Sequence, residues 1–510
     1  MAPLDLTAAL DLRMAIQNLR IEFVGDWHQD PWGWPELGFL LKNPSFVHSH
    51  VRNTGTAHQA APIDVPKENW GVRPAVVLNI LDRLTYQALV DRSSVPLIGD
   101  MTPNAFGWRL PPETPVAGVY SHNDKQWSGY RRHLERLTVF NTVALTTDIV
   151  SCFATIPVQS LQEAVYDRCP ANAITRRLCD LLGRFASFPN RSGLPQRSFA
   201  SAVLANMYLA PLDDVLLHFA SPAPRSLGSG GVGYKSYARW MDDFWLFCKR
   251  PSTVRRAQVE LQSAVRDMGL NLNSAKTEVF EGDDMTRMVM ELEHSAVDGA
   301  IVEDDFGPLD ELVDELIAHP ESASRTSTRF ACQRMKENEE FRRVNALLRV
   351  AARMPHVADH LSRLFKEAYE WRSLQDWFLE YADSEWATYE WSIAHFARMF
   401  PSSDTPKKAL REYFIRIVRD ANTSLPLLAV AAQRLAGWDK AEARAAFKDT
   451  FVRVSNPHAR RVIAISALAA GERRTQVRRW LETDDDNAVT TQLLEGSSWQ
   501  PLKVTKDYAR

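Results

Sequence analysis

The chain has 510 residues, of which 45% are hydrophobic and 24% are charged, and its formal net charge at pH 7 is −3. This length exceeds one ordinary domain and this composition is that of a folded protein, so we expect two or three domains and exclude a disordered chain. The near-neutral charge argues against a broad basic surface for nonspecific duplex binding, and it leaves room for a local basic groove.

The cysteine content and the N-terminal residues bear on the compartment. The five cysteines are odd in number and form no C-x-x-C pair, which indicates buried free thiols in a reducing compartment rather than a zinc site. The first residues lack the basic run and apolar core of a signal peptide, and no stretch reaches the ~18 apolar residues of a spanning helix. We therefore expect a cytoplasmic protein without a membrane partner.

The chain up to about residue 300 mixes strand-like and helix-like patterns. Residues 143–150 have the pattern of a buried strand that ends near Asp148, and residues 234–247 read as two short aromatic strands joined by a turn at Met241-Asp242. Caps and breakers predict helices: one after Pro157 opened by a capping box at Ser160–Glu163, one over 198–209 ended by Pro211, and one capped by Ser252 and ended before Gly269. A short strand over 270–273 would follow.

Beyond about residue 305 the strand patterns fade and amphipathic helical stretches follow one another. They are 309–318, 341–353, 357–370, 385–399, 407–420, 424–436, 440–453, 457–470 and 473–482. Paired helices at this spacing favour a HEAT-like helical-repeat array, and a plain helical bundle stays open because no clean repeat is visible. We expect an N-terminal segment of unpredicted fold over 1–66, an α+β domain over 67–300 and an all-α domain over 305–510.

Three carboxylates stand where strands end. Asp148 ends one predicted strand, and Asp242 and Asp243 lie in the turn between two others. An Asp pair in a turn is usually solvated, but here aromatic strands on both sides indicate a buried hairpin, in which uncompensated charge is costly. Transfer of a phosphoryl group needs in-line positioning by divalent cations ~3.5–4 Å apart, and Mg²⁺ prefers carboxylate oxygens. The pattern therefore predicts a metal-binding site.

Around these carboxylates the sequence resembles the reverse transcriptases, with the motifs in the family's order. The matching segments over 67–277 are Arg73-Pro74, Asp82–Leu84 and Gln87–Leu89, then Leu145–Phe153, then Gly193–Gln196 continuing to Asn206, then Tyr237–Asp243, then Gly269–Asn273 with Lys276 and Thr277. The resemblance implies a reverse-transcriptase-like palm and fingers. Viral RNA-dependent RNA polymerases usually carry a second Asp at the Phe153 position and Gly at the Met241 position, so both residues favour deoxynucleotides.

The resemblance implies a role for each matching residue near the metals. Asp148 and Asp242 would hold two Mg²⁺ ions, for which Mn²⁺ could substitute, with Asp243 assisting and the Ile149 carbonyl as a further ligand. Phe153 would lie beneath the incoming sugar and exclude a 2′-hydroxyl by steric overlap, and an ordinary core aromatic is the alternative.

Further residues would contact the rest of the nucleotide. Gln196 would border it, and Arg73 would clamp the triphosphate, because a planar guanidinium matches phosphate geometry. Lys276 would approach the leaving pyrophosphate as a cation or an acid. A surface arginine and a solvated lysine are the alternatives for Arg73 and Lys276.

Two departures narrow the resemblance. Arg197 follows Gln196 where a Gly is common, and its bulk and charge put ordinary template placement in doubt. A helical array also takes the place of a thumb or nuclease. A reverse-transcriptase core followed by helical repeats is similar to the bacterial abortive-infection reverse transcriptases, and the chain looks closest to the prophage-encoded member of that group.

Membership in this group implies phage defence, assembly into a homo-oligomer, and synthesis of single-stranded DNA from dNTPs without a template. It also implies priming from a protein hydroxyl, which would leave the DNA covalently attached. A tyrosine is a plausible primer: the first in the chain is Tyr86, Tyr120 and Tyr130 lie in a loop-like region, and Tyr508 lies in a C-terminal segment that could reach an active site. Serine and threonine stay open, and no residue is assigned. Two other functions stay open: a conventional RNA-templated enzyme of the retron or intron type, and a defence sensor or scaffold with a polymerase-derived core.

Overall fold

The computed structural model describes residues 9–52, 58–186, 188, 193–223, 234–291, 295–496 and 499–501. The chain forms two compact units. The sheet unit comprises the described parts of Met1–Glu22, Val47–Ala57 and Arg83–Ala296, and the helical unit comprises those of Phe23–Phe46, His58–Asp82 and Val297–Arg510. The predicted N-terminal segment 1–66 is therefore shared between the two units.

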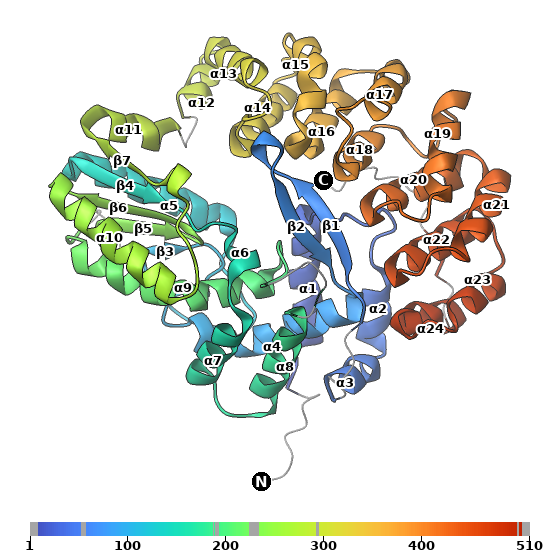
Figure 1. Cartoon of the computed structure of the whole chain (residues 1–510), viewed down its shortest axis with the longest axis horizontal. Coiled ribbons are helices and arrows are strands. Elements are labelled where there is room, and N and C mark those ends of the chain that lie inside the picture. The colour runs from blue at the N-terminus through green and yellow to red at the C-terminus, as the bar shows by residue number, and fades with distance from the viewer. Residues whose placement is uncertain are drawn as a thin grey trace. The chain divides into compact units, whose positions relative to one another are not determined.

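The sheet unit is built on a five-stranded sheet in the order β3-β5-β6-β4-β7 (Figure 1). The strands are β3 (Ala105–Phe106), β4 (Val143–Thr147), β5 (Tyr237–Trp240), β6 (Asp243–Cys248) and β7 (Glu278–Glu281). β5 and β6 form an antiparallel hairpin, and β4 pairs antiparallel with both β6 and β7. The predicted strand before Asp148 and the predicted aromatic hairpin are confirmed.

Helices cover both faces of this sheet. Trp245 and Phe247 share a core with residues of α5 (Asn123–Phe140) and α11 (Gly282–Glu291). Side chains alternate along a strand, so Phe244 and Leu246 point to the other face. There α9 (Phe199–Phe219) and α10 (Pro251–Asp267) pack on one another and on the strands.

The remaining elements before residue 303 are divided between the two units. They are α1 (Leu12–Glu22), η1 (Phe23–Gly25), α2 (Pro35–Lys42), α3 (Ser45–Arg52), β1 (Ala61–Pro66), η2 (Glu68–Trp70), β2 (Val72–Val77), α4 (Ile80–Ile98), α6 (Cys152–Thr155), α7 (Val158–Arg168), α8 (Ala173–Phe185), η3 (Ser274–Lys276) and α12 (Ser295–Val302). β1 and β2 pair as an antiparallel hairpin within the helical unit.

Three predicted helix ends are wrong. α9 continues through Pro211 to Phe219, because the packing of its buried residues before and after the exposed proline offsets the loss of one backbone hydrogen bond. α7 begins at Val158, directly after Pro157, so the predicted capping box lies inside the helix. α10 begins at Pro251 rather than after a Ser252 cap, since proline is pre-organised for the first helical position.

The segment after α10 is partly as predicted. Gly269 follows the helix with a φ of +74°, the left-handed conformation that glycine adopts without strain. The expected strand over 270–273 is only a single bridge between Leu272 and Ile149. α9 is also the one helix in the described residues long and apolar enough to cross a membrane, but 72% of its most apolar stretch is buried in the protein.

The helical unit contains two rows of helices. They are α13 (Gly307–Ala318), α14 (Arg325–Glu337), α15 (Val344–Val350), α16 (Ala358–Ala368), α17 (Leu374–Ala382), α18 (Glu390–Ala397), α19 (Lys408–Arg419), α20 (Leu425–Trp438), α21 (Lys440–Phe451), α22 (Pro457–Ala469), α23 (Arg474–Leu481) and α24 (Ala488–Gly496). Short turns of helix lie between them at η4 (Ala351–Arg353), η5 (Pro355–Val357), η6 (Trp371–Ser373) and η7 (Asp485–Asn487). The helices α14, α16, α18, α20 and α22 pack in succession and form the inner row.

The C-terminal region is mostly helical, as predicted, although α14, α17 and α24 had not been predicted. The HEAT-like assignment stays a prediction.

Residues 27–36 and the β1–β2 hairpin pack along the inner row. Trp391 of α18 donates to the Trp27 carbonyl (2.9 Å), Gln433 of α20 donates to the Pro31 carbonyl (3.0 Å), and Trp32 donates to Ser466 of α22 (2.9 Å). The buried hairpin side chains Ile63, Val65, Ala75 and Val77 join the same core. Successive helices thus hold successive residues of an N-terminal segment for which the sequence predicted no fold.

Candidate active site

The strand register brings the three predicted carboxylates to one edge of the sheet. Thr147, the last residue of β4, pairs with Phe244, so Asp148 continues beside Asp243. Trp240 pairs with Asp243, which leaves Met241 and Asp242 as a two-residue connection. The ends of β4 and of the β5–β6 hairpin therefore present Asp148, Asp242 and Asp243 together.

The three carboxylates interact electrostatically. The surrounding protein removes part of the hydration of Asp243, and the negative charges of Asp242 and Asp148 add to this effect, so its pKa rises to about 7. The positive charge of Lys276 acts in the opposite direction. The pKa of the neighbouring Cys152 thiol is raised by burial and by the same acids. Such mutual repulsion favours a bound cation between the carboxylates.

The two oxygens of Asp148 have different surroundings. Oδ2 lies 3.2 Å from Lys276 Nζ, whereas Oδ1 is buried and accepts no hydrogen bond within the described part of the chain. A buried carboxylate oxygen without a partner is costly unless a cation binds it. Carboxylate oxygens are also the donors that Mg²⁺ prefers, so the residues present fit a divalent metal.

The backbone after Asp148 offers one more oxygen ligand. The bridge between Ile149 and Leu272 uses the Asp148 carbonyl, which accepts from Asn273 N (2.9 Å), and the Val150 N–H, which donates to Asn271 O (2.9 Å). The Ile149 carbonyl is not used in this bridge. Its predicted role as a metal ligand is compatible with this geometry and stays a prediction.

Lys276 reaches the site from η3, between the bridge and β7. Its side chain is 69% exposed although its amino group pairs with Asp148. Thr277 next to it forms a hydroxyl–hydroxyl hydrogen bond with Thr147 (2.7 Å), which ties the fourth motif to the end of β4. The first, third and fourth predicted motifs are thus brought together.

The second predicted motif packs on the first. Leu194 N–H donates to the Phe153 carbonyl (2.6 Å), and Gly193 has a φ of +70°. A Cβ on Gly193 would overlap the Phe153 carbonyl oxygen and lie 2.7 Å from the Ala154 carbonyl carbon, so only glycine fits this approach. Phe153 itself is half-buried on α6.

Gln196 and Arg197 follow on the same loop. Gln196 is half-buried, and Arg197 is exposed with a φ of +59°, before Ser198 caps α9. Arg197 therefore adopts the left-handed conformation of a glycine, the residue that is common there in the family. The backbone path of a glycine is kept and a long cationic side chain is added.

Arg73 has an aromatic partner in its own unit. It is on β2 in the helical unit, where its guanidinium stacks 4.9 Å from the centre of the Trp27 ring. The three carboxylates belong to the sheet unit. A triphosphate role for Arg73 stays a prediction.

The candidate priming tyrosines differ in surroundings. Tyr86 is fully buried with its hydroxyl 3.1 Å from Ser201 Oγ, and Tyr120 donates to Asp91 Oδ1 (2.8 Å). Tyr130 on α5 is 3% exposed. Its burial raises the pKa of its hydroxyl, and the negative charge of Asp243 raises this pKa further. Tyr508 lies outside the described residues. No primer is assigned.

Sequence reasoning missed the network beneath the turn. Arg239 is fully buried and binds Asp213 and Asn206 of α9 together with the Met241 carbonyl. The available signal was a charged residue inside an otherwise apolar strand, which requires a buried partner.

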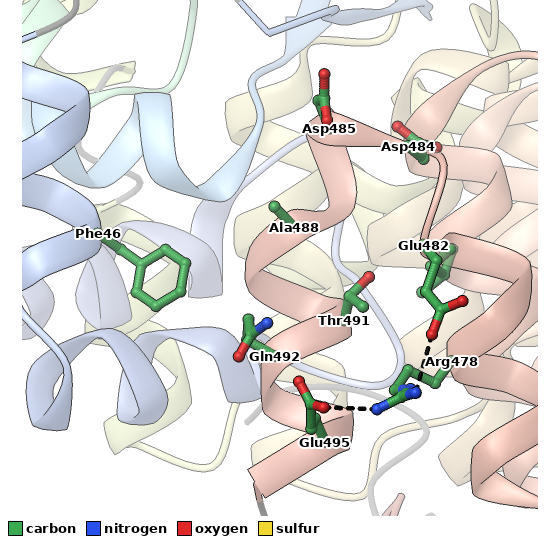
Figure 2. Close-up of a pocket in the computed structure, with 10 residues that line it drawn as sticks. Phe46, Arg478, Glu482, Asp484, Asp485, Ala488, Thr491, Gln492 and Glu495 are labelled. Carbon is green, nitrogen blue, oxygen red and sulfur yellow. Dashed lines mark hydrogen bonds and ion pairs between the residues drawn. The ribbon is translucent and has the colours of Figure 1, made fainter.

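A pocket of the helical unit was also considered. It has a volume of about 360 Å³ and lies against α23 and α24, with Glu482, Asp484, Asp485 and Glu495 in its lining (Figure 2). Arg478 is already paired with Glu482 (3.0 Å) and Glu495 (2.6 Å). Such an acidic lining repels phosphates, so we assign no nucleotide to it.

The comparisons with known proteins agree with the geometry. Residues 65–305 match the family model described as reverse transcriptase (RNA-dependent DNA polymerase). No curated protein matches the chain. The matched range contains the three carboxylates, Lys276 and the second-motif loop. Residues 65–305 therefore form a reverse-transcriptase domain, of a family that uses divalent metals and nucleotides, and a mostly helical region follows it.

Proposed function

We propose that this protein is an antiphage DNA polymerase of the abortive-infection reverse-transcriptase group. It would transfer deoxynucleotides from dNTPs by a two-metal mechanism, without a template and with a protein hydroxyl as primer. The observation that carries the polymerase chemistry is the cluster of Asp148, Asp242 and Asp243 inside a reverse-transcriptase domain, with a buried Asp148 oxygen that has no hydrogen-bond partner among the described residues. A cytoplasmic location, a homo-oligomer, a prophage origin and DNA attached to the protein are parts of the same proposal.

The side chains divide the work of the reaction. Asp148, Asp242 and Asp243, with the Ile149 carbonyl, would hold two Mg²⁺ ions, which stabilise the charge on the attacking and leaving oxygens when bound. Lys276 holds a positive charge beside Asp148, where it would neutralise or protonate the leaving pyrophosphate.

The loop and helix beside the metals would select the nucleotide. Phe153 would exclude a sugar with a 2′-hydroxyl, and Gln196 would border the bound nucleotide. Leu194 and Gly193 fix the Phe153 backbone, which supports this assignment because a selective ring has to be held in place.

Arg197 supports the untemplated reaction. A glycine at this place lets the backbone lie close to a template, and Arg197 keeps that backbone conformation while adding bulk and positive charge. The side chain would then occupy space that a template base requires. We propose that it also attracts the phosphates of the DNA product.

The test is incubation of the purified full-length protein with labelled dNTPs and Mg²⁺ in the absence of nucleic acid. We expect DNA that migrates with the protein on a denaturing gel, and a nucleotide adduct on one residue by mass spectrometry. Asp242→Asn should abolish the signal, and a chelator should do the same. Asp283→Asn, an exposed acid on α11, is the matched control and should leave it unchanged. DNA synthesis by Asp242→Asn would refute the mechanism.

The two alternatives give different results. A templated enzyme of the retron or intron type would make a product that copies an added RNA and would need Asp242. If the protein is a sensor or scaffold, the Asp242→Asn variant would still protect cells from phage. The inner row of helices, the surface that such arrays commonly use for binding, is already covered by residues 27–36 and the β1–β2 hairpin, which favours the enzyme.

A further inference from the structure

The connection between β5 and β6 has an unusual backbone. Two residues join the strands, and the first of them, Met241, has a φ of +57°. Two-residue hairpins with a positive φ at the first position usually have Gly, Asn or Asp there, because the Cβ of most other residues is strained in this conformation. Met241 is nevertheless 5% exposed, so its side chain is part of the core. Such a turn persists only when the surrounding structure holds it.

Arg239 supplies this hold. It lies two residues before Met241 on β5, is fully buried, and donates from Nη1 to the Met241 carbonyl (3.2 Å). The Met241 carbonyl belongs to the peptide that leads into Asp242. A hydrogen bond to this oxygen therefore restrains the peptide plane that carries Asp242, the residue directly before Asp243.

The guanidinium is itself fixed by α9. Nε and Nη2 donate to the two oxygens of Asp213 (3.0 and 2.6 Å), and Nη1 also donates to Asn206 Oδ1 (2.9 Å). Asn206 in turn donates to the Gly107 carbonyl (3.0 Å), next to β3. Four of the five guanidinium hydrogens are thus used, and the negative charge of Asp213 balances the positive charge of Arg239.

We propose that Arg239 is a positioning residue for the metal site. It acts through the Met241 carbonyl, with Asp213 and Asn206 as its anchors on α9, and it sets the placement of Asp242 and Asp243. The proposal rests on the proposed function in so far as these acids bind the catalytic metals. Arg239 has no contact with the nucleotide in this scheme.

Arg239→Lys is the central variant. Lysine keeps the charge but cannot form the planar, bidentate contact with Asp213 and reach the Met241 carbonyl at the same time. We expect Mn²⁺ binding to the nucleotide-free protein, measured by electron paramagnetic resonance, to weaken roughly tenfold, the scale on which outer-shell partners of metal ligands act. kcat should fall by a similar factor, and the KM for dNTP should change less than threefold. Hydrogen exchange in the peptide spanning Met241 should accelerate.

Asn206→Ala is the second variant, because it removes one anchor and leaves the ion pair with Asp213 intact. We expect Mn²⁺ binding to weaken about threefold, which is less than the loss expected for Arg239→Lys. This variant keeps the inference testable if Arg239→Lys fails to fold.

Arg461→Lys is the matched control. Arg461 is also a buried arginine bound to carboxylates, Glu36 and Asp30, but it belongs to the helical unit. The Arg461→Lys substitution should lower thermal stability and leave both Mn²⁺ binding and hydrogen exchange at the Met241 turn unchanged.

The possible outcomes separate the two proposals. Unchanged Mn²⁺ affinity and unchanged exchange at the turn in folded Arg239→Lys or Asn206→Ala would overturn the positioning role, and so would an equal loss of Mn²⁺ affinity in Arg461→Lys. A parent protein that makes no DNA but shows the expected order of Mn²⁺ affinities would refute the polymerase and keep the positioning role. If the parent protein binds no Mn²⁺, hydrogen exchange at the Met241 turn alone tests the positioning role of Arg239.

Discussion

Gly193→Ala tests how the second motif is attached to the first. Gly193 has a left-handed φ of +70°, and a methyl group on it would overlap the Phe153 carbonyl oxygen. The loop would have to move away from α6, which breaks the hydrogen bond from Leu194 N–H to the same oxygen. Gly282→Ala is the matched control, because Gly282 also has a positive φ (+54°), but among the described residues beyond its chain neighbours no heavy atom lies within 4 Å of the added methyl group.

The expected losses follow from these two contacts. A left-handed conformation costs an L residue about 1–2 kcal/mol, which is the effect on the folded state expected for Gly282→Ala. Gly193→Ala loses in addition the Leu194 hydrogen bond, and a buried donor left unpaired costs about 1–3 kcal/mol. The unfolded-state effect of replacing glycine is common to both variants and cancels in the comparison. Gly193→Ala should therefore be the less stable by about 1–3 kcal/mol.

Two measurements check this difference. Urea unfolding followed by tryptophan fluorescence compares the free energies of unfolding of the two variants. Hydrogen exchange of the Leu194 amide reports the broken bond directly and should accelerate in Gly193→Ala alone. Equal destabilisation by both variants, or an unchanged Leu194 exchange rate in Gly193→Ala, would refute the reasoning.

Substitutions at three further positions test the nucleotide side of the site. Phe153→Ala should raise the use of ribonucleotides relative to deoxynucleotides roughly tenfold or more, the scale on which a pocket discriminates one small group, and unchanged sugar selectivity in competition assays would remove the steric role. Arg197→Gly should let the product copy an added template, whereas Arg197→Ala, which keeps the Cβ, should copy it less. Sequencing the products measures the copying, and random sequences from both variants would contradict the proposed effect of Arg197 on template placement. Lys276→Ala should lower kcat roughly 10²-fold if Lys276 protonates the leaving pyrophosphate. Lys276→Arg should restore activity only if a positive charge at this position is enough for the reaction. Single-turnover rates measure both effects.

Local patterns in the sequence were sufficient for the centre of the fold. The aromatic alternation on both sides of Met241-Asp242 predicted the β5–β6 hairpin, and the apolar stretch before Asp148 predicted β4. Gly269 predicted the end of α10, and helical periodicity predicted most of the C-terminal helices. Each of these signals depends on residues within a few positions of one another. The carboxylates could be found for the same reason, since each stands directly after or between such elements.

Contacts between residues far apart in the chain could not be predicted from those local patterns. The helix persists through Pro211 because residues on both sides of the proline, 200–209 before it and Leu212, Asp213 and Leu216 after it, are buried in the tertiary structure. Residues 27–36 had no predicted fold because the groups that hold them, such as Trp391 and Gln433, lie hundreds of positions later. The stacking of Arg73 on Trp27 was likewise not predicted, because the two residues are far apart in the chain.

The sequence by itself thus determined the reverse-transcriptase domain and the identity of its acids, because strand pattern, turn residues and motif order are local properties. Only the tertiary structure decided how those acids are held. The left-handed φ of Met241 and the partners of Arg239 depend on side chains from α9, 26 and 33 positions away in the chain. A buried charge requires a partner, but which residue provides it is set by packing rather than by any local pattern.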